Sequence, residues 1–302
     1  MMNNSRQQKK GSRYLITCLM LIAVLFSISY LWQMAFGDGS TDGFTDSTHV
    51  DSGLSEQFYD SHQGASEQSA VRKLELPRLT ANQPEQILER EGFTVSFNPK
   101  TNCPNYVCWY LTARRTRGHV ERTDLFEGDP EISKDKRIEY FDYDRSRYDR
   151  GHMCPAADNK NSEKGMKDCF LMTNICPQAH NLNKGVWNDL EMECRSWARN
   201  YTSIHIACGP IFDKKRLTYI GQRKGHRIAV PDRFFKVIYM KGRVPKAIGF
   251  VYPNDDTNLP MRDYAMSVDE VERIAGIDFF YQLDDRIEDK IEAECNPSAW
   301  GI

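Results

Sequence analysis

A single long amphipathic segment among many short strand-like segments constrains the fold of this chain most. In residues 184–199 the apolar side chains of Val186, Leu190, Cys194 and Trp197 recur at helical spacing, which predicts a helix with one buried face. A shorter helix is expected at 268–274, and strands are expected at 92–97, 106–112, 170–173, 203–208, 234–239 and 247–252. Strands that follow one another with few helices between them favour an α+β domain built on a largely antiparallel sheet.

The residues before this domain are expected to stay outside the fold. Residues 1–13 are basic, and residues 14–36 are apolar and uncharged over a length that spans a bilayer. A signal-anchor helix with a cytoplasmic flank is the favoured interpretation, and a cleaved signal peptide is the alternative. Residues 37–73 have the composition of a flexible linker, which leaves 74–302 as the folded domain. The sequence therefore predicts an exported protein, either membrane-anchored and facing the periplasm or exterior, or secreted.

Cysteines and net charge add two weaker expectations. Nine cysteines are present, and all but Cys18 follow the linker. An even number in an exported domain predicts disulfide bonds, with Cys103 and Cys108 suited to a hairpin around a turn at 102–105. A zinc site is disfavoured because no Cys-x-x-Cys pattern repeats, and free thiols are the remaining alternative. The formal net charge of −2 disfavours a broadly basic surface but allows a local basic cleft.

Residues 149–152 and Asn183 combine side chains that suit the hydrolysis of a phosphodiester. An imidazole such as that of His152 titrates near neutral pH and acts as a general base; the alternative is a structural histidine. A guanidinium such as that of Arg150 binds phosphate through two hydrogen bonds; the alternative is an ion pair with Asp149. The amide oxygen of Asn183 suits a hard cation such as Mg²⁺; the alternative is capping of the helix that follows it.

Three further polar side chains are expected to support these groups. Asp149 is interpreted as a structural partner, and Asn174 as a hydrogen-bonding partner of the catalytic loop or, alternatively, as part of a strand-end turn. Glu191 lies about two helical turns beyond Asn183. It is expected to orient a metal-bound water or, alternatively, to pair with Arg195 four residues later.

Three segments together resemble the DNA/RNA non-specific endonuclease family, the ββα-metal or His-Me finger group. The segments are 148–156, 170–178 and 182–191, and weaker similarity continues through 209–212, 230–237 and 276–280. The resemblance covers about residues 90–283. It implies a ββα-metal catalytic core within the α+β domain, and DNA and RNA as substrates.

The resemblance also implies a role for each matching residue. His152 corresponds to the general base, and Asn183 to the protein ligand of a single Mg²⁺, for which Mn²⁺ can substitute. Arg150 and Glu191 correspond to accessory positions near the phosphate and the metal. Arg122 corresponds to a further arginine that contacts the phosphate in the transition state, and the products would carry a 5′-phosphate.

The favoured prediction is an exported, Mg²⁺-dependent, sugar-non-specific endonuclease. Residues 14–36 would contact the membrane if they are not cleaved, and the sequence identifies no protein partner. Two other functions remain as alternatives. One is a module that binds nucleic acid without metal-stimulated cleavage. The other is a Cys/His hydrolase that uses Cys154 or Cys176, two cysteines by which this chain departs from the commoner family pattern.

Overall fold

The computed structural model describes residues 73–213 and 215–302. The predicted flank at 1–13, the apolar segment at 14–36 and residues 37–72 of the predicted linker lie outside the described residues.

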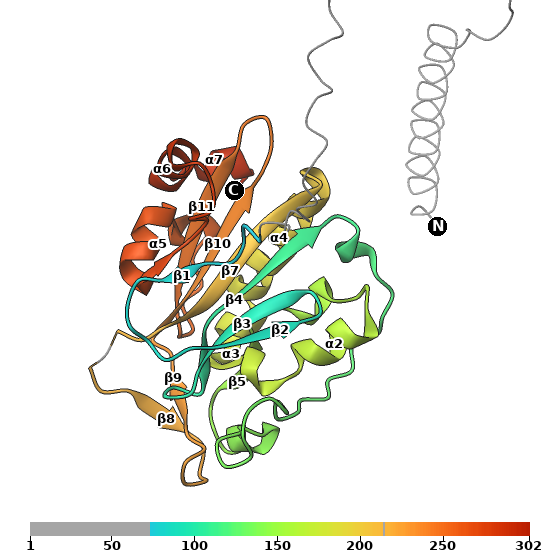
Figure 1. The fold of residues 1–302 in the computed structure, drawn as a ribbon, viewed down its shortest axis with the longest axis vertical. Coiled ribbons are helices and arrows are strands. Elements are labelled where there is room, and N and C mark those ends of the chain that lie inside the picture. Colours follow the sequence, from blue (N-terminus) through green and yellow to red (C-terminus); the bar gives the residue numbers. More distant parts are fainter. Residues whose placement is uncertain (1–72, 214) are drawn as a thin grey trace, which may run out of the picture. The chain divides into compact units, whose positions relative to one another are not determined.

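A seven-stranded sheet forms the centre of the described domain, and all of its neighbouring strands run antiparallel (Figure 1). Its strand order is β12-β11-β10-β7-β4-β3-β2. The strands are β2 (Gln86–Arg90), β3 (Phe93–Asn98), β4 (Cys103–Thr112), β7 (Ser203–Ile211), β10 (Arg233–Met240), β11 (Lys246–Pro253) and β12 (Ala265–Met266). This arrangement confirms the predicted α+β fold with a largely antiparallel sheet.

Helices and short strand pairs surround the sheet (Figure 1). The helices are α2 (Glu163–Cys169), α3 (His180–Lys184), α4 (Val186–Asn200), α5 (Val268–Ala275), α6 (Asp285–Ala293) and α7 (Pro297–Trp300). The strand pairs are β1 (Arg78–Leu79) with β13 (Ile277–Asp278), β5 (Asp149–His152) with β6 (Ile175–Gln178), and β8 (Thr218–Ile220) with β9 (Ile228–Val230).

Apolar side chains cover both faces of the sheet, because successive residues of a strand point to opposite sides. In β4, Val107 and Trp109 belong to a core shared with α4, whereas Tyr106 and Cys108 belong to a second core shared with α5 and α6. The β5–β6 pair also contributes to the first core, through Ile175 among others. The face of the sheet that carries α4 is therefore the face beside the predicted catalytic residues.

Most predicted elements are confirmed, and two are wrong. The predicted strand at 170–173 is instead the C-cap of α2 at Phe170, a single bridge residue at Leu171 and the beginning of a 3-10 turn at Met172–Asn174, and the strand begins only at Ile175. The predicted helix at 184–199 begins at Val186, because Gly185 (φ −100°, ψ −118°) separates α4 from the short helix α3. A Cβ on Gly185 would lie 2.5 Å from the carbonyl oxygen of Asn181, so this break requires glycine.

Candidate active site

A short antiparallel pair of strands and the two helices after it form the frame of the site. Strand β5 pairs antiparallel with β6, and β6 leads directly into α3 and α4. Gly151 of β5 lies opposite Cys176 of β6, and a Cβ on Gly151 would come within 2.6 Å of the Gln178 side chain. Only glycine allows the two strands to approach this closely.

His152 lies at the end of β5 between two phenylalanine rings. Its ring centroid is 5.3 Å from that of Phe126 and 4.9 Å from that of Phe170. The guanidinium of Arg150 lies 4.9 Å from the Phe126 ring, and that of Arg122 lies 5.0 Å from the Phe170 ring. The two phenylalanine rings therefore hold the imidazole in place, and an arginine guanidinium lies over each of these rings.

Burial makes the imidazole of His152 neutral. The side chain is 8% exposed, and its Nε2 is buried without a hydrogen-bond partner among the described residues. Burial and, secondarily, the charge of Arg122 lower the pKa of His152 to about 3, because both disfavour the imidazolium form. At neutral pH the ring is therefore unprotonated, which is the state that a general base requires before it reacts.

Neither arginine beside the histidine is held in a buried ion pair. Arg150 donates a hydrogen bond from Nη1 to the carbonyl oxygen of Tyr140 at 3.3 Å. It has no carboxylate partner in the described part of the chain, so the alternative of an ion pair with Asp149 does not hold. Arg122 is half-exposed and donates to Asp124 at 2.6 Å. Exposed ion pairs of this kind contribute little and are readily exchanged for a phosphate.

Asn183 lies within α3, and its amide is oriented by a carboxylate. Its Nδ2 donates to Oδ2 of Asp149 at 2.9 Å, and Asp149 also lies 3.0 Å from Nδ1 of His180. A carboxylate accepts hydrogen bonds only, so it fixes which end of the amide faces it. Oδ1 of Asn183 has no hydrogen-bond partner among residues 73–213 and 215–302. The alternative in which Asn183 caps the long helix does not hold, since Gly185 occupies that position.

Glu191 lies on α4 without a hydrogen bond or ion pair in the described part of the chain. Burial raises its pKa to about 7, against the opposing charges of Lys236 and Arg195. Arg195 instead donates to Asp158 at 3.0 Å, so the alternative pairing of Glu191 with Arg195 is not found. An unpaired, partly buried carboxylate is available to a cation or to a water molecule.

Asn174 connects the segment after His152 to the end of α2. Its Oδ1 accepts from the backbone N–H of Cys154 at 2.9 Å, and its Nδ2 donates to the carbonyl oxygens of Cys154 at 2.9 Å and Cys169 at 2.8 Å. All of these groups are buried. The geometry agrees with the expected contact to the catalytic loop.

Sequence reasoning missed three residues of the site. Phe126 and Phe170 enclose His152, but no pattern in the sequence connects them. Lys236 of β10 is 1% exposed, and its Nζ lies 4.2 Å from the centroid of the Trp187 ring. A lysine at a buried position of an apolar strand is the signal that could have found it, because lysine is rarely fully buried without a charged or aromatic partner.

The bonding state of the cysteines differs from the predicted disulfide bonds. All eight that follow the linker are free thiols, seven of them buried, so the predicted disulfide bonds are wrong for this part of the chain. Burial raises the pKa values of the Cys154 and Cys176 thiols well above their usual range. The reactive species in cysteine chemistry is the thiolate, so these two residues do not suit a Cys/His hydrolase.

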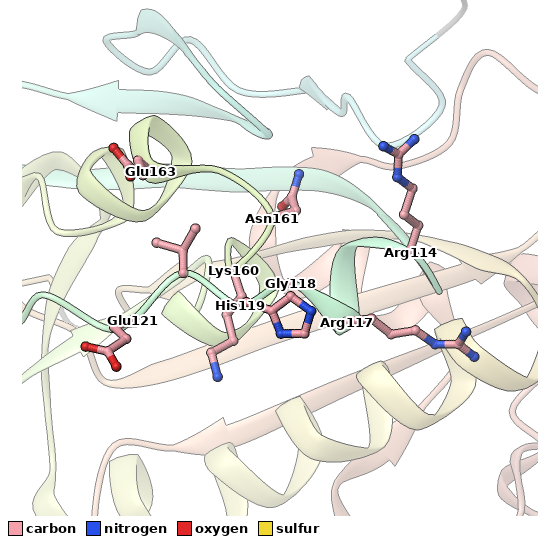
Figure 2. A pocket seen from close by; sticks show the side chains of 9 residues that line it. Arg114, Arg117, Gly118, His119, Glu121, Lys160, Asn161 and Glu163 are labelled. Carbon is pink, nitrogen blue, oxygen red and sulfur yellow. The ribbon is translucent and has the colours of Figure 1, made fainter.

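A surface pocket of about 810 Å³ borders the segment that carries Arg122 (Figure 2). Arg114 and Arg117 enter it from the 3-10 turn after β4, and Lys160 enters from a loop near α2. Glu121, which immediately precedes Arg122, and Glu163 also line it. The lining of the pocket therefore combines three Lys or Arg side chains with two carboxylates, within a protein of slightly negative net charge.

Comparison with known proteins agrees with this geometry. The family model for DNA/RNA non-specific endonucleases matches residues 72–286. The protein named Nuclease EXOG, mitochondrial, from Xenopus laevis is 34% identical over 258 residues, which cover 73% of this chain and 71% of the relative. Human Endonuclease G, mitochondrial, is 32% identical over 206 residues, covering 64% and 69%. Nuclease C1 from Cunninghamella echinulata var. echinulata is 32% identical over 212 residues, covering 66% and 84%.

A solved structure is also similar. The crystal structure of the EndoG/EndoGI complex superposes with a TM-score of 0.63 at 26% sequence identity. The match covers 68% of this chain and 90% of that chain, so the similarity extends over nearly the whole of the solved chain.

The predicted location is corrected by these comparisons. Two of the relatives described above are named as mitochondrial nucleases, which contradicts the expectation of an exported or membrane-anchored protein. Within residues 73–213 and 215–302, no helix has the length and apolar character needed to cross a membrane.

The family match, the relatives and the structural neighbour together identify the family of this chain. The matched region contains β5, β6, α3 and α4, which are the elements that carry His152 and Asn183. The relatives are named nucleases, and the family is one of metal-dependent nucleases. The chain therefore belongs to the DNA/RNA non-specific endonuclease family and is a hydrolase of that class.

Proposed function

We propose that this chain is a Mg²⁺-dependent, sugar-non-specific endonuclease in which His152 is the general base. One observation carries the proposal. A buried, neutral imidazole lies between two phenylalanine rings, each of which has an arginine guanidinium over it, on strand β5, whose partner strand β6 leads into the helix of Asn183. A base, two phosphate-binding groups and a free amide oxygen are the set that phosphodiester hydrolysis requires.

In the proposed reaction each side chain acts on a separate part of the phosphodiester. His152 accepts a proton from the water that attacks phosphorus. Arg122 and Arg150 bind the non-bridging phosphate oxygens and stabilise the charge that develops on them. Contacts to the backbone of the substrate instead of to base edges explain the absence of sequence selectivity.

The residues around Asn183 fit a divalent cation. Asp149 occupies the amide nitrogen of Asn183 and leaves its oxygen free, while Glu191 has no competing cationic partner among the described residues. Asn183 would hold the metal and Glu191 would orient a water on it, with Asp149 keeping the amide in place. When bound, Mg²⁺ supplies Lewis-acid stabilisation of the charge on the leaving oxygen. Mn²⁺, which prefers similar oxygen ligands, is the expected substitute.

Cleavage of both nucleic acids is the direct test. We expect the full chain to nick supercoiled DNA and to degrade RNA in Mg²⁺, to lose both activities in EDTA, and to regain them when Mg²⁺ is restored. Product ends labelled by a kinase only after phosphatase treatment would identify 5′-phosphates. Binding of DNA without metal-stimulated cleavage would instead identify a binding module and contradict the proposal.

We further propose that the pocket in Figure 2 binds a phosphate of the substrate backbone next to the reacting one. Replacing Arg117 by alanine is expected to raise KM with little change in kcat, because the group lies away from the reacting atoms. The slope of log affinity against log salt concentration is expected to fall by about 1, since one counterion fewer is released. Fluorescence anisotropy of labelled DNA across a salt series measures this slope.

The matched control is Lys241→Ala, which removes an exposed cation from the turn between β10 and β11. This control is expected to leave both KM and the salt slope unchanged. Equal slopes for Arg117→Ala and the wild type would show that the pocket does not contact the substrate.

A further inference from the structure

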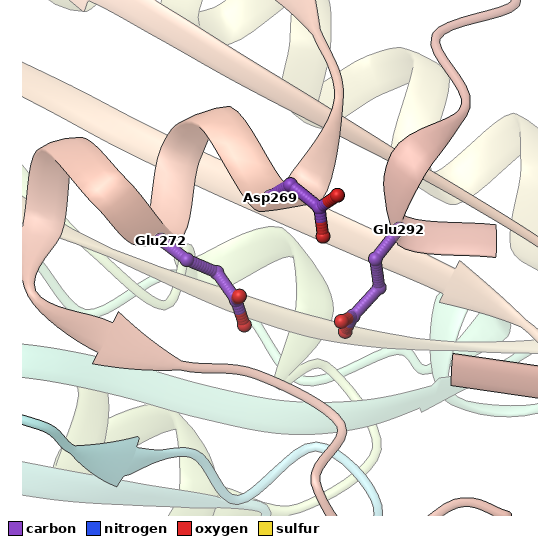
Figure 3. A group of neighbouring side chains, drawn as sticks. All are labelled: Asp269, Glu272 and Glu292. Atoms are coloured by element: carbon purple, nitrogen blue, oxygen red, sulfur yellow. The ribbon is translucent and has the colours of Figure 1, made fainter. Parts of the chain in front are cut away.

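Three carboxylates meet between the helices α5 and α6, on the sheet face opposite to α4 (Figure 3). Asp269 and Glu272 extend from α5, and Glu292 extends from α6 toward them. One oxygen from each residue lies within 4.8 Å of the others. The candidate catalytic residues lie on the other face, so this cluster is separate from them.

Glu292 is buried, and one of its oxygens has no partner. The residue is 4% exposed, and its Oε1 is buried without a hydrogen-bond partner among the described residues. Its carboxylate points toward Asp269 and Glu272 (Figure 3). A buried polar atom without a partner is costly. This orphaned oxygen therefore points to a ligand between the two helices.

No cationic side chain neutralises the cluster. None of the three carboxylates forms an ion pair in the described part of the chain, and two nearby arginines are already paired: Arg273 with Glu270, and Arg78 with Asp278. Glu272 accepts one hydrogen bond, from the backbone N–H of Phe279 at 2.7 Å. The negative charge therefore has to be balanced by protons or by a bound cation.

Without a cation, protons would have to remain on the cluster. Burial and then the neighbouring carboxylates raise the pKa of Glu292 to about 9 and that of Glu272 to about 7. A carboxyl whose pKa is raised on folding stabilises the protein below its unfolded pKa, and this stabilisation is lost as pH rises through the folded value. The cation-free protein should therefore lose stability as pH rises from about 4.5, the ordinary value, to about 9, the folded value of Glu292.

We propose that Asp269, Glu272 and Glu292 bind one hard divalent cation of the Ca²⁺ type, which connects α5 to α6. Oxygen ligands lie about 2.3–2.6 Å from Ca²⁺, so oxygens on opposite sides of the ion are up to about 5 Å apart. The three carboxylate oxygens fit around one such ion. Asp269 is exposed, which gives the ion an entry route and leaves positions for water. Mg²⁺ fits less well because it requires a tighter octahedron at about 2.0–2.1 Å.

The test is thermal unfolding and calorimetric titration of the full chain in an Asn183→Ala background, which removes the proposed catalytic metal ligand. We expect one Ca²⁺ to bind and to raise Tm by about 5–10 °C at saturation. In EDTA, Tm should fall as pH rises from 6 to 9, and Ca²⁺ should abolish this fall. The same fall with and without Ca²⁺ would show that protons alone balance the cluster and would overturn the proposal.

Two substitutions locate the ion. Glu292→Gln preserves the side-chain volume and removes the carboxylate that would bind the ion, so it should abolish both the calorimetric binding and the Ca²⁺-induced rise in Tm. Asp269→Asn, at an exposed position, tests the same site if Glu292→Gln does not fold. The matched control Asp289→Asn removes an exposed carboxylate from α6 outside the cluster and should bind Ca²⁺ like the parent. Undiminished Ca²⁺ binding by Glu292→Gln or Asp269→Asn would overturn the assignment.

Discussion

Replacing His152 by alanine is expected to reduce cleavage of DNA and of RNA by about 10²–10⁴-fold, which is the usual contribution of a positioned general base. Both substrates should be affected equally, because the same base activates the same water. The state of the imidazole is compatible with this role: burial and the charge of Arg122 lower its pKa, so the ring is unprotonated at the pH of the assay. Initial rates on supercoiled plasmid and on RNA in Mg²⁺ measure the effect.

If His152 had only a structural role, His152→Ala would lose activity because the protein unfolds. A second variant distinguishes this loss of fold from the loss of a general base. Removing a buried ring leaves a cavity and lowers stability, so His152→Gln, which fills more of the space, is examined beside His152→Ala. Circular dichroism should show a folded protein for both variants. The control His226→Ala removes an imidazole from the loop between β8 and β9 and should retain activity. Substantial cleavage by folded His152→Ala would eliminate this residue as the base.

The catalytic motif at 149–152 and the helix α4 could be predicted because local patterns carry the information, whereas the pairing of β5 with β6 could not. The residue types at 149–152 indicate a catalytic motif, and the apolar positions of α4 repeat at helical spacing. The boundary between α3 and α4 could not be predicted, since the helical pattern continues through Gly185. That break depends on the close approach of the Asn181 carbonyl oxygen, which only the folded chain defines.

The surroundings of His152 could not be predicted for a related reason. Phe126 and Phe170 are far from His152 and from each other in the sequence, and they meet only through tertiary packing. The prediction of disulfide bonds was wrong because an even number of cysteines suggests disulfides only in an oxidising compartment. In the folded domain seven of these thiols are buried, and Cys103, Cys154 and Cys176 are core residues.

Replacing Asn183 by alanine is expected to raise the Mg²⁺ concentration needed for half-maximal cleavage by at least about 10–100-fold, and to lower the rate at a fixed Mg²⁺ concentration accordingly. Loss of a residue that merely supports a metal ligand has an effect of this size, and loss of the ligand itself should equal or exceed it. The amide oxygen is the atom concerned, because Asp149 already occupies the amide nitrogen. Cleavage rates across a Mg²⁺ titration measure the shift.

The same helix offers a matched control for this metal-binding role. Asn181 lies two residues earlier on α3 and is exposed, so Asn181→Ala removes an amide of the same kind without touching Asp149. It should leave the Mg²⁺ titration unchanged. A variant that only weakens the fold would lower the maximal rate without moving the midpoint, whereas a lost ligand moves the midpoint. An unchanged midpoint for Asn183→Ala would therefore place the metal on other residues, even if its maximal rate were reduced.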